Sequence, residues 1–300
     1  MKKEKLNGRE SDPRLLDMTT YTELKTAFDS LGLNDVPVIA HASLRSFEEV
    51  EGGAPMVVQA FVDSFAGVVM PTHTYKTMIV PHAGPENNAM DYGAPDPFNT
   101  SPEFFTPHMP ADVLMGVIPE ALRQRPGAKR SSHPILSFAG FNADHILASQ
   151  TPKEPLAPIQ ALAEENGWVV LAGVDHTVNT SMHLAEKLAG RRQFIRWALV
   201  RDILTRPVPL KLAGRNFAST SVNERVVECP GFPGCSAGFQ AITRDVQPFT
   251  RRVTAGKSAI QAVPLAALLH AVISRINQDS KALLCFDPAC ARCNTVRMSL

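Results

Sequence analysis

Apolar runs and amphipathic stretches alternate through the first two thirds of the chain. Short apolar runs at residues 36–40, 68–70 and 168–171 are typical of buried strands. Amphipathic patterns predict helices at residues 20–31, 56–64, 118–125 and 159–165, and Thr20 and Gly32 are suitable residues for the start and the end of the first. Because strands alternate with helices, we expect an α/β fold in which helices flank a central mixed sheet.

The pattern changes after residue 190. Segments 194–200, 225–229 and 246–254 have the composition of strands joined by Pro- and Gly-rich turns, and residues 264–276 predict an amphipathic helix. Since no linker separates these parts, we expect one domain over residues 19–300. It would consist of a core at 19–190 and a smaller β-rich lobe with a C-terminal helix at 191–300. The charged residues 1–18 are expected to form a flexible tail.

Composition excludes several classes of protein. The net charge is +1, so no basic field points to nucleic acid or to an anionic membrane. No apolar run approaches the roughly 20 residues of a membrane-spanning helix, and the N-terminus lacks the apolar core of a secretory signal. The five cysteines are an odd number, which does not imply a complete disulfide framework. We therefore expect a cytoplasmic protein, and the sequence is compatible with a homodimer.

Three polar segments directly follow predicted strands. They are residues 41–45, 71–75 and 175–183. In α/β sheets, ligands bind where loops leave the carboxyl ends of the strands. We therefore expect these three segments to converge on a functional site.

The third segment lies within the stretch GVDHTVNTSMHLAEKLAG at residues 173–190. Asn179 or Thr180 can cap a helix there, and Gly190 can end it. His183 and Glu186 are then three residues apart on one helical face. A neutral histidine in the first helical turn, held by a carboxylate, is equipped to act as a general base. Asp175 could replace Glu186 as the acid that orients His183. The simplest other interpretation is an amphipathic helix with a polar histidine at its edge and no catalytic role.

Charge is segregated in the middle of the chain. Residues 77–122 contain no Lys or Arg and carry six acids, which suits either a lid over a cationic ligand or a solvated surface. The acids are Glu86, Asp91, Asp96, Glu103, Asp112 and Glu120. Arg123, Arg125, Lys129 and Arg130 follow directly, and they suit either phosphate binding or a basic surface turn.

The remaining histidines and the cysteines give weaker indications. His133 precedes a proline and an apolar run, where a structural hydrogen-bonding role is the common one. The spacing C-x4-C-x2-C at Cys285, Cys290 and Cys293, with Cys235 as a fourth ligand, resembles part of a zinc knuckle. It departs from the paired C-x2-C pattern, so we favour free thiols over structural zinc.

Six ordered motifs together resemble the aminoglycoside 3-N-acetyltransferase family. They are HASLRSF, EGGA, VVMPTHTY, MGVIPEALRQRPGAKRSSHPILSFAG, EPLAPIQAL and GVDHTVNTSMHLAE. The resemblance implies acetyl transfer from acetyl-coenzyme A to the 3-amino group of a 2-deoxystreptamine antibiotic, which confers resistance. The catalytic histidine of the family's N-T-x-x-H-x-A-E motif corresponds to His183, and its acid to Glu186.

The resemblance also implies a coenzyme site and a substrate site. The coenzyme site would comprise His41, Ala42, Ser43, Leu44, Arg45, Thr72, Thr74, Met115, Arg130, Ser137 and Phe138. The substrate would contact Tyr75, Asp96, Asp175, Asn179 and Glu186.

Two other interpretations remain. The acceptor segment TMIVPHAGPENNAMDYGAPDPFNT departs from the tryptophan-rich loop expected of resistance enzymes, so an acyltransferase with another amine acceptor is the main alternative. The other is a zinc-stabilised binding protein whose histidines are structural.

Overall fold

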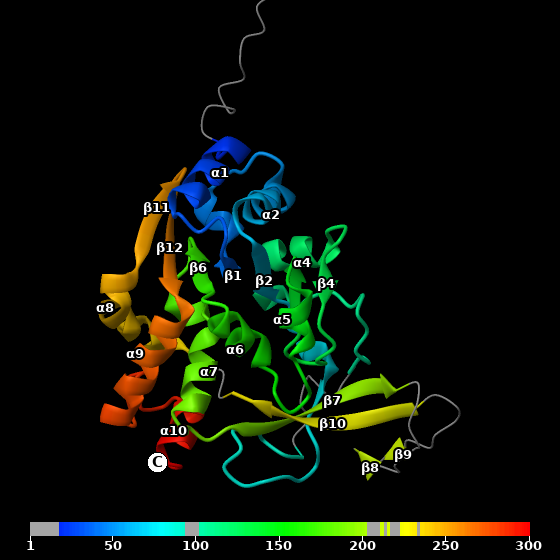
Figure 1. The fold of residues 1–300 in the computed structure, drawn as a ribbon. Coiled ribbons are helices and arrows are strands. Elements are labelled where there is room, and N and C mark those ends of the chain that lie inside the picture. The colour runs from blue at the N-terminus through cyan, green and yellow to red at the C-terminus, as the bar shows by residue number, and fades with distance from the viewer. Residues whose placement is uncertain (1–17, 94–101, 203–210, 213–214, 217–222, 233–234) are drawn as a thin grey trace, which may run out of the picture.

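A seven-stranded mixed sheet forms the centre of the protein (Figure 1), as expected from the sequence. The computed structural model describes residues 18–93, 102–202, 211–212, 215–216, 223–232 and 235–300. Three neighbouring strands run parallel, in the order β6 (Trp168–Ala172), β1 (Pro37–Ala42) and β2 (Gly67–Pro71). Antiparallel strands extend both edges: β12 (Ser258–Pro264) and β11 (Arg251–Ala255) beside β6, and β5 (Phe138–Phe141) and β4 (Lys129–Arg130) beside β2.

Helices cover both faces of this sheet. Alternate residues of a strand point to opposite faces, so Val38 and Ala40 join one core while Ile39 joins the other. The first core contains α1 (Tyr21–Ser30), α2 (Gly53–Ser64) and α4 (Val117–Gln124). The second contains α5 (Asp144–Ala148), α6 (Ala157–Glu164), α7 (Ser181–Leu188) and α9 (Leu265–Gln278). Burial on both faces explains why the strands are continuous apolar runs.

The first helix illustrates how local sequence sets the element bounds. Thr20 and Glu23 form a reciprocal capping box at the start of α1, in which each side chain accepts from the backbone N–H of the other. Leu31 is the C-cap, and Gly32 follows with a φ of +66°. Glycine adopts this left-handed conformation without the steric cost of a Cβ atom, so the helix ends where the sequence predicted.

A second, three-stranded sheet lies beside the first and has the order β10–β7–β3. It consists of β3 (Met78–Ile79), β7 (Phe194–Asp202) and β10 (Asn223–Gly231). The strand expected over 246–254 is shorter, because α8 (Thr243–Val246) and the 3-10 turn η7 (Gln247–Phe249) occupy its first half. The residues after 190 contribute to both sheets. They supply β7 and β10 of the second sheet, and they also supply β11 and β12 of the main sheet.

Short elements complete the description. The β8–β9 pair is Lys211–Leu212 and Arg215–Asn216, and α10 (Ala291–Arg297) lies near the C-terminus. The other 3-10 turns are η2 (Leu44–Phe47), η3 (Tyr75–Thr77), η4 (Val113–Met115), η5 (His176–Val178) and η6 (Ala237–Ile242). Residues 1–17 and Asp96 lie outside the described residues.

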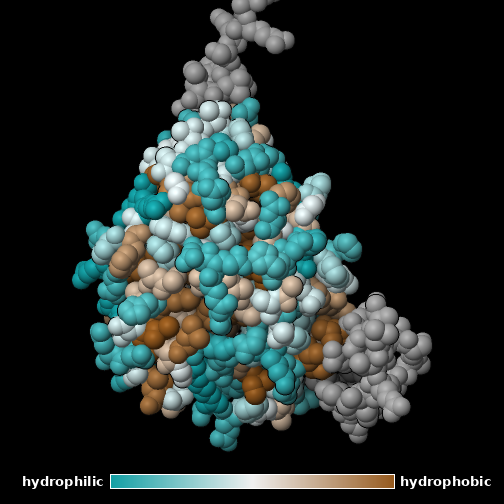
Figure 2. Space-filling model, in the orientation of Figure 1, coloured by the Kyte–Doolittle hydropathy of each residue, from teal (hydrophilic) through white to brown (hydrophobic). Residues whose placement is uncertain are grey.

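Polar residues cover most of the face shown in Figure 2, with apolar residues in small groups among them. In the part of the chain that the structure describes, none of the helices combines the length and the apolar character needed to cross a bilayer.

Candidate active site

The three polar segments that follow β1, β2 and β6 leave the same edge of the sheet. Because these strands are parallel neighbours, their carboxyl ends lie together. The backbone N–H of Ser43 donates to Ala172 O at 3.1 Å, which joins the segment after β1 to the end of β6. Gly173 has a φ of +67°, and a Cβ there would lie 1.6 Å from Ser46 Oγ. Only glycine allows the chain to leave β6 so close to the loop after β1.

His183 lies in the first turn of α7. Thr180 is the N-cap of the helix but does not cap it with its side chain, and Asn179 Oδ1 accepts from the backbone N–H of Ser181 at 3.0 Å instead. Gly190 follows the C-cap with a φ of +82°. The helix therefore has the start and the end that its sequence indicated.

His183 contacts an acid, which in turn contacts an arginine. His183 Nδ1 lies 2.8 Å from Glu186 Oε2, and Arg191 Nη1 donates to Glu186 Oε1 at 2.6 Å. Burial of Glu186 raises its pKa, but the hydrogen bond with His183 and the charge of Arg191 outweigh burial and lower the pKa overall. Glu186 is therefore a carboxylate that accepts from both partners. The motif spacing predicted the His183–Glu186 contact, whereas no pattern in the sequence indicated Arg191.

Two aromatic rings enclose the imidazole. Phe232 stacks on His183 with ring centroids 4.7 Å apart and an interplanar angle of 15°, and Phe239 packs edge-on at 5.1 Å. Sequence reasoning did not assign either ring to the site. The only indication was the stretch GCSAGF, which the family resemblance covers loosely.

The alternative acid, Asp175, has another role. Its carboxylate accepts from the backbone N–H of Thr177 at 2.8 Å and from the Thr177 hydroxyl at 2.5 Å, which caps η5. Asn179 is buried, and its side-chain amide lies 3.2 Å from His176 Nδ1. Both residues thus shape the loop before α7, and Glu186 is the acid that contacts His183.

Buried histidines underlie the site. Burial, together with the charge of neighbouring histidines, lowers the pKa of His41 and of His73 to about 3. His176 and His133 have pKa values lowered to about 4, again chiefly by burial. His133 Nδ1 accepts the backbone N–H groups of Ile135 and Leu136, which is the structural role expected for it. All four side chains are therefore neutral near pH 7.

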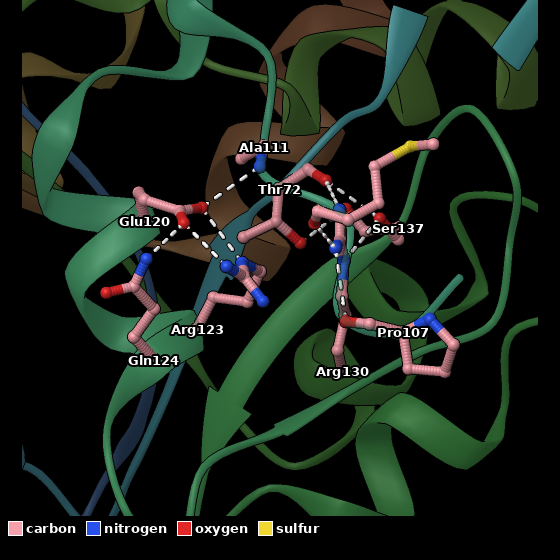
Figure 3. A network of polar contacts seen from close by, with 9 residues as sticks. Thr72, Pro107, Ala111, Glu120, Arg123, Gln124, Arg130 and Ser137 are labelled. Atoms are coloured by element: carbon pink, nitrogen blue, oxygen red, sulfur yellow. Dashed lines mark hydrogen bonds and ion pairs between the residues drawn. The ribbon is translucent and has the colours of Figure 1, made fainter. Parts of the chain in front are cut away.

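Arg130 lies at the centre of the polar network in Figure 3. Its guanidinium donates to Thr72 O at 2.7 Å, to Ser137 Oγ at 3.1 Å, and to the carbonyl groups of Pro107 and Met109. Burial lowers the pKa of Arg130 to about 10, with a further contribution from the charge of Arg123. These bonds engage donors that the sequence assigned to a phosphate, and the coenzyme role of Arg130 stays a prediction. The donors of Arg130 fasten residues 107–109 to the end of β2.

The other basic side chains of this turn also contact groups of the protein. Arg123 forms a bidentate pair with Glu120, Lys129 pairs with Asp144, and Arg125 lies over the ring of Phe141. Arg45, in contrast, is exposed at the edge of the sheet after β1. Among the described residues of the predicted coenzyme site, Arg45 is the cation best placed to meet a phosphate.

The remaining predicted residues divide into buried and accessible ones. Thr72, Thr74, Ser137 and Phe138 are buried, and the Thr74 hydroxyl donates to Pro134 O at 2.5 Å. The accessible or half-buried residues are Ala42, Ser43, Leu44, Tyr75 and Met115.

The segment after β2, which includes His73 and Tyr75, contacts the acidic segment. Its hydroxyl lies 3.2 Å from His73 Nδ1. Burial, together with the charge of Asp112, raises the pKa of Tyr75 to about 12. The backbone N–H of Asp112 donates to His73 O at 2.7 Å, so this part of the acidic segment is fixed against the site. Some of the predicted lid acids also bind protein groups, since Glu103 pairs with Lys76 and Glu120 with Arg123.

Comparison with known proteins identifies the family of the chain. The sequence model of the aminoglycoside 3-N-acetyltransferase family matches residues 39–276. The chain belongs to this family. The aminoglycoside N(3)-acetyltransferase VII of Streptomyces paromomycinus is 32% identical over 57% of this chain and 61% of its own length. The YokD protein of Bacillus subtilis, described as aminoglycoside N(3')-acetyltransferase-like, is 30% identical over 58% of this chain and 68% of its own.

Solved structures of acetyltransferases share the fold. The apoenzyme of aminoglycoside acetyltransferase AAC(3)-IVa superposes with a TM-score of 0.71 at 21% identity, covering 94% of this chain and 98% of the other. The acetyltransferase AAC-IIIb, solved with CoASH, gives 0.66 at 20% identity over 87% and 97% of the two chains. The seven-stranded sheet and its helices are thus those of an acetyltransferase of this family.

Proposed function

We propose that the protein transfers the acetyl group of acetyl-coenzyme A to the 3-amino group of a 2-deoxystreptamine aminoglycoside, with His183 as general base. Such a reaction confers resistance to the antibiotic. The observation that carries the proposal is the array of half-buried His183 with buried Glu186 and Arg191, with contacts of 2.8 and 2.6 Å, at the carboxyl edge of the parallel strands.

The array determines which nitrogen of His183 takes the proton. Glu186 is a carboxylate, so we assign the Nδ1–H of neutral His183 as the donor to Glu186 Oε2. The lone pair of the neutral ring then lies on Nε2. As the acceptor amine forms its C–N bond to the acetyl carbon, Nε2 removes the amine proton. The C–S bond of the thioester then breaks, and the sulfur leaves as a thiolate that takes up a proton. Glu186 stabilises the imidazolium formed during the reaction.

A hydrogen-bond donor is also needed for the oxygen of the tetrahedral intermediate. The Thr74 hydroxyl is committed to Pro134 O, and the backbone N–H of Ser43 is committed to Ala172 O. The hydroxyl of half-buried Ser43 is therefore a better candidate for this donor than the hydroxyl of Thr74.

The coenzyme is proposed to lie along the edge that follows β1 and β2. Arg45 is exposed there and can meet a phosphate as a charged donor. Val113 and Leu114 of η4 are 90% and 78% exposed, and they give the adjoining surface apolar area suited to the aliphatic part of the coenzyme. The related AAC-IIIb structure holds CoASH, which supports this class of co-substrate.

The acceptor is proposed to be a polycation that enters beside Tyr75 and the acidic segment. Related structures hold a gentamicin and sisomicin, which are aminoglycosides. The same chemistry on a different amine is the second candidate. It is favoured by the pairing of Glu103 and Glu120 with basic residues of the protein, which leaves fewer free acids than the sequence suggested.

Product analysis distinguishes the two candidates. Acetyl-coenzyme A would be incubated with the protein and either kanamycin, gentamicin or simple polyamines, and the products would be located by mass spectrometry and NMR. A single acetyl group on the 3-amino nitrogen supports the first proposal. Acetylated polyamines without any acetylated aminoglycoside would contradict it and favour the second.

A further inference from the structure

Four of the five cysteines meet in space, although they come from two distant parts of the sequence. Their Sγ atoms all lie within 4.8 Å of one another, and no disulfide joins them. We call these residues the cysteine cluster: Cys235, Cys285, Cys290 and Cys293. We propose that the cysteine cluster binds one structural zinc ion through four thiolates.

The separation of the sulfur atoms fits a tetrahedral metal site. With Zn–S bonds of about 2.3 Å, the sulfur atoms of a tetrahedron are about 3.8 Å apart. Sγ atoms that lie within 4.8 Å of one another need to move only slightly to reach that geometry. Four sulfur ligands in a tetrahedron are typical of zinc or iron, and closed four-cysteine sites that serve structure are typical of zinc.

The backbone around the cysteine cluster is arranged for thiolates. Cys290 is the N-cap of α10 and Cys293 lies in its first turn, so the pair C-x2-C opens a helix. The backbone N–H of Cys285 donates to Cys293 Sγ at 3.4 Å. Hydrogen bonds from surrounding groups orient metal ligands and hold their charge.

Burial and charge agree with a structural role. Cys285 and Cys293 are buried, and they pack with Phe194, Leu284 and Val296 in a small apolar cluster. Each thiol loses its proton when it binds the metal, so a zinc ion with four thiolates carries two negative charges. Arg297 donates to the carbonyl group of Cys285, which places a positive charge beside the site.

The zinc ion would connect the C-terminal segment with the wall of the candidate active site. Cys235 lies between Phe232 and Phe239 in the sequence, and these two rings pack on His183. Phe232 and Val296 of α10 also line a small cavity beside Glu186 and Arg191. The metal would thus hold Cys235, the sequence neighbour of both rings, against the C-terminal segment, and it takes no part in the reaction.

Metal analysis of the purified protein tests the proposal without reference to activity. The full chain would be prepared under reducing conditions with zinc in the medium and then gel-filtered. Inductively coupled plasma mass spectrometry should then find about one zinc ion per chain. Replacement by Co²⁺ should produce the absorption bands of a tetrahedral cobalt site with thiolate ligands. Cys293→Ser should lose the metal, and Cys229→Ala should keep it, because Cys229 lies outside the cysteine cluster.

The wild-type measurement alone can overturn the proposal, even if Cys293→Ser does not fold. Wild-type protein without metal, or one whose reduced thiols all react freely in the presence of added zinc, contradicts it. Iron in place of zinc contradicts the assignment of the ion. The result is independent of the proposed reaction, since a protein with zinc and no acetyltransferase activity supports this proposal and opposes the other.

Discussion

A carboxylate that is only 5% exposed needs partners to keep its charge, and Glu186 has two. His183 and Arg191 each contact one of its oxygens. Removing one member of a buried charge pair typically costs about 3–5 kcal/mol, because the other charge is left unpaired. At the residue scale, the site is therefore a coupled unit in which Glu186 positions the base and Arg191 fixes Glu186.

Glu186→Gln removes the charge and preserves the shape of the side chain. We expect kcat to fall by about 10- to 100-fold, because the imidazolium formed during the reaction loses its stabilising carboxylate. The acidic limb of the pH–rate profile should move to lower pH, since a positive charge on the base becomes less favourable. Steady-state kinetics between pH 5 and 9 would measure both effects.

Glu154→Gln is the matched control, because Glu154 pairs with Lys187 on the exposed side of the same helix. Its profile should coincide with that of the wild type. A Glu186→Gln enzyme with an unchanged rate and an unchanged profile would show that the carboxylate does not assist His183.

At the scale of elements, one arginine connects three segments. The guanidinium of Arg130 on β4 reaches the end of β2 and the carbonyl groups of residues 107 and 109. Hydrogen bonds from charged groups contribute about 1.5–3 kcal/mol each. A planar fork makes these contacts together, and the ammonium of a lysine cannot reproduce them.

Arg130→Lys should therefore loosen residues 102–112 while the main sheet stays folded. We expect a loss of about 2–4 kcal/mol in the free energy of unfolding and faster amide hydrogen exchange in this segment. Urea unfolding and hydrogen-exchange mass spectrometry measure the two effects. Lys129→Met, which removes an exposed pair with Asp144, should change stability by less than about 1 kcal/mol. Equal effects of the two substitutions would contradict the role assigned to Arg130.

The sequence predicted elements well where local patterns define them. The start of α1 at Thr20, the helix that carries His183 and the three central strands all follow from local sequence patterns. The parallel strands are continuous apolar runs, and the segments after them were therefore expected at one edge. The His183–Glu186 contact was accessible for the same reason, because residues three apart share a helical face.

Contacts between distant segments were not predictable in this way. Phe232 and Phe239 complete the surroundings of His183, but nothing in their local sequence shows that the chain returns to α7. Arg191 follows α7 directly, yet its contact with Glu186 depends on the turn at Gly190 and not on a helical spacing. The contacts of the basic turn were hidden for a related reason, since donors of Arg130 meet carbonyl groups of segments that lie far away in the sequence. The sequence did name Cys235 as a possible partner of the three late cysteines, and the structure brings its thiol beside theirs although they lie 50 or more residues later.

At the scale of the whole molecule, the buried histidines make stability depend on pH. The pKa values of His41 and His73 are about 3 in the folded protein, and those of His133 and His176 are about 4. In the unfolded chain they return to about 6.5. Between these values the unfolded state binds more protons, so the free energy of unfolding falls as the pH decreases.

We expect stability to be highest above about pH 6.5 and to decrease towards pH 4, by up to about 1.4 kcal/mol per pH unit for each histidine. Urea unfolding at pH 7.5, 6.0 and 5.0 measures the slope. His176→Asn should give a shallower slope, whereas His270→Asn, on the exposed side of α9, should leave it unchanged. A stability independent of pH between 7.5 and 5.0 would show that these histidines are not buried in the neutral form.

The central claim is that His183 removes the proton of the acceptor amine. The most direct measurement is the release of thiol from acetyl-coenzyme A in the presence of an aminoglycoside, with wild type and His183→Ala compared at equal coenzyme saturation. We predict turnover by the wild type and a loss of about 10²- to 10⁴-fold in kcat for the variant, with coenzyme binding unchanged. Equal turnover by the two proteins would contradict the account.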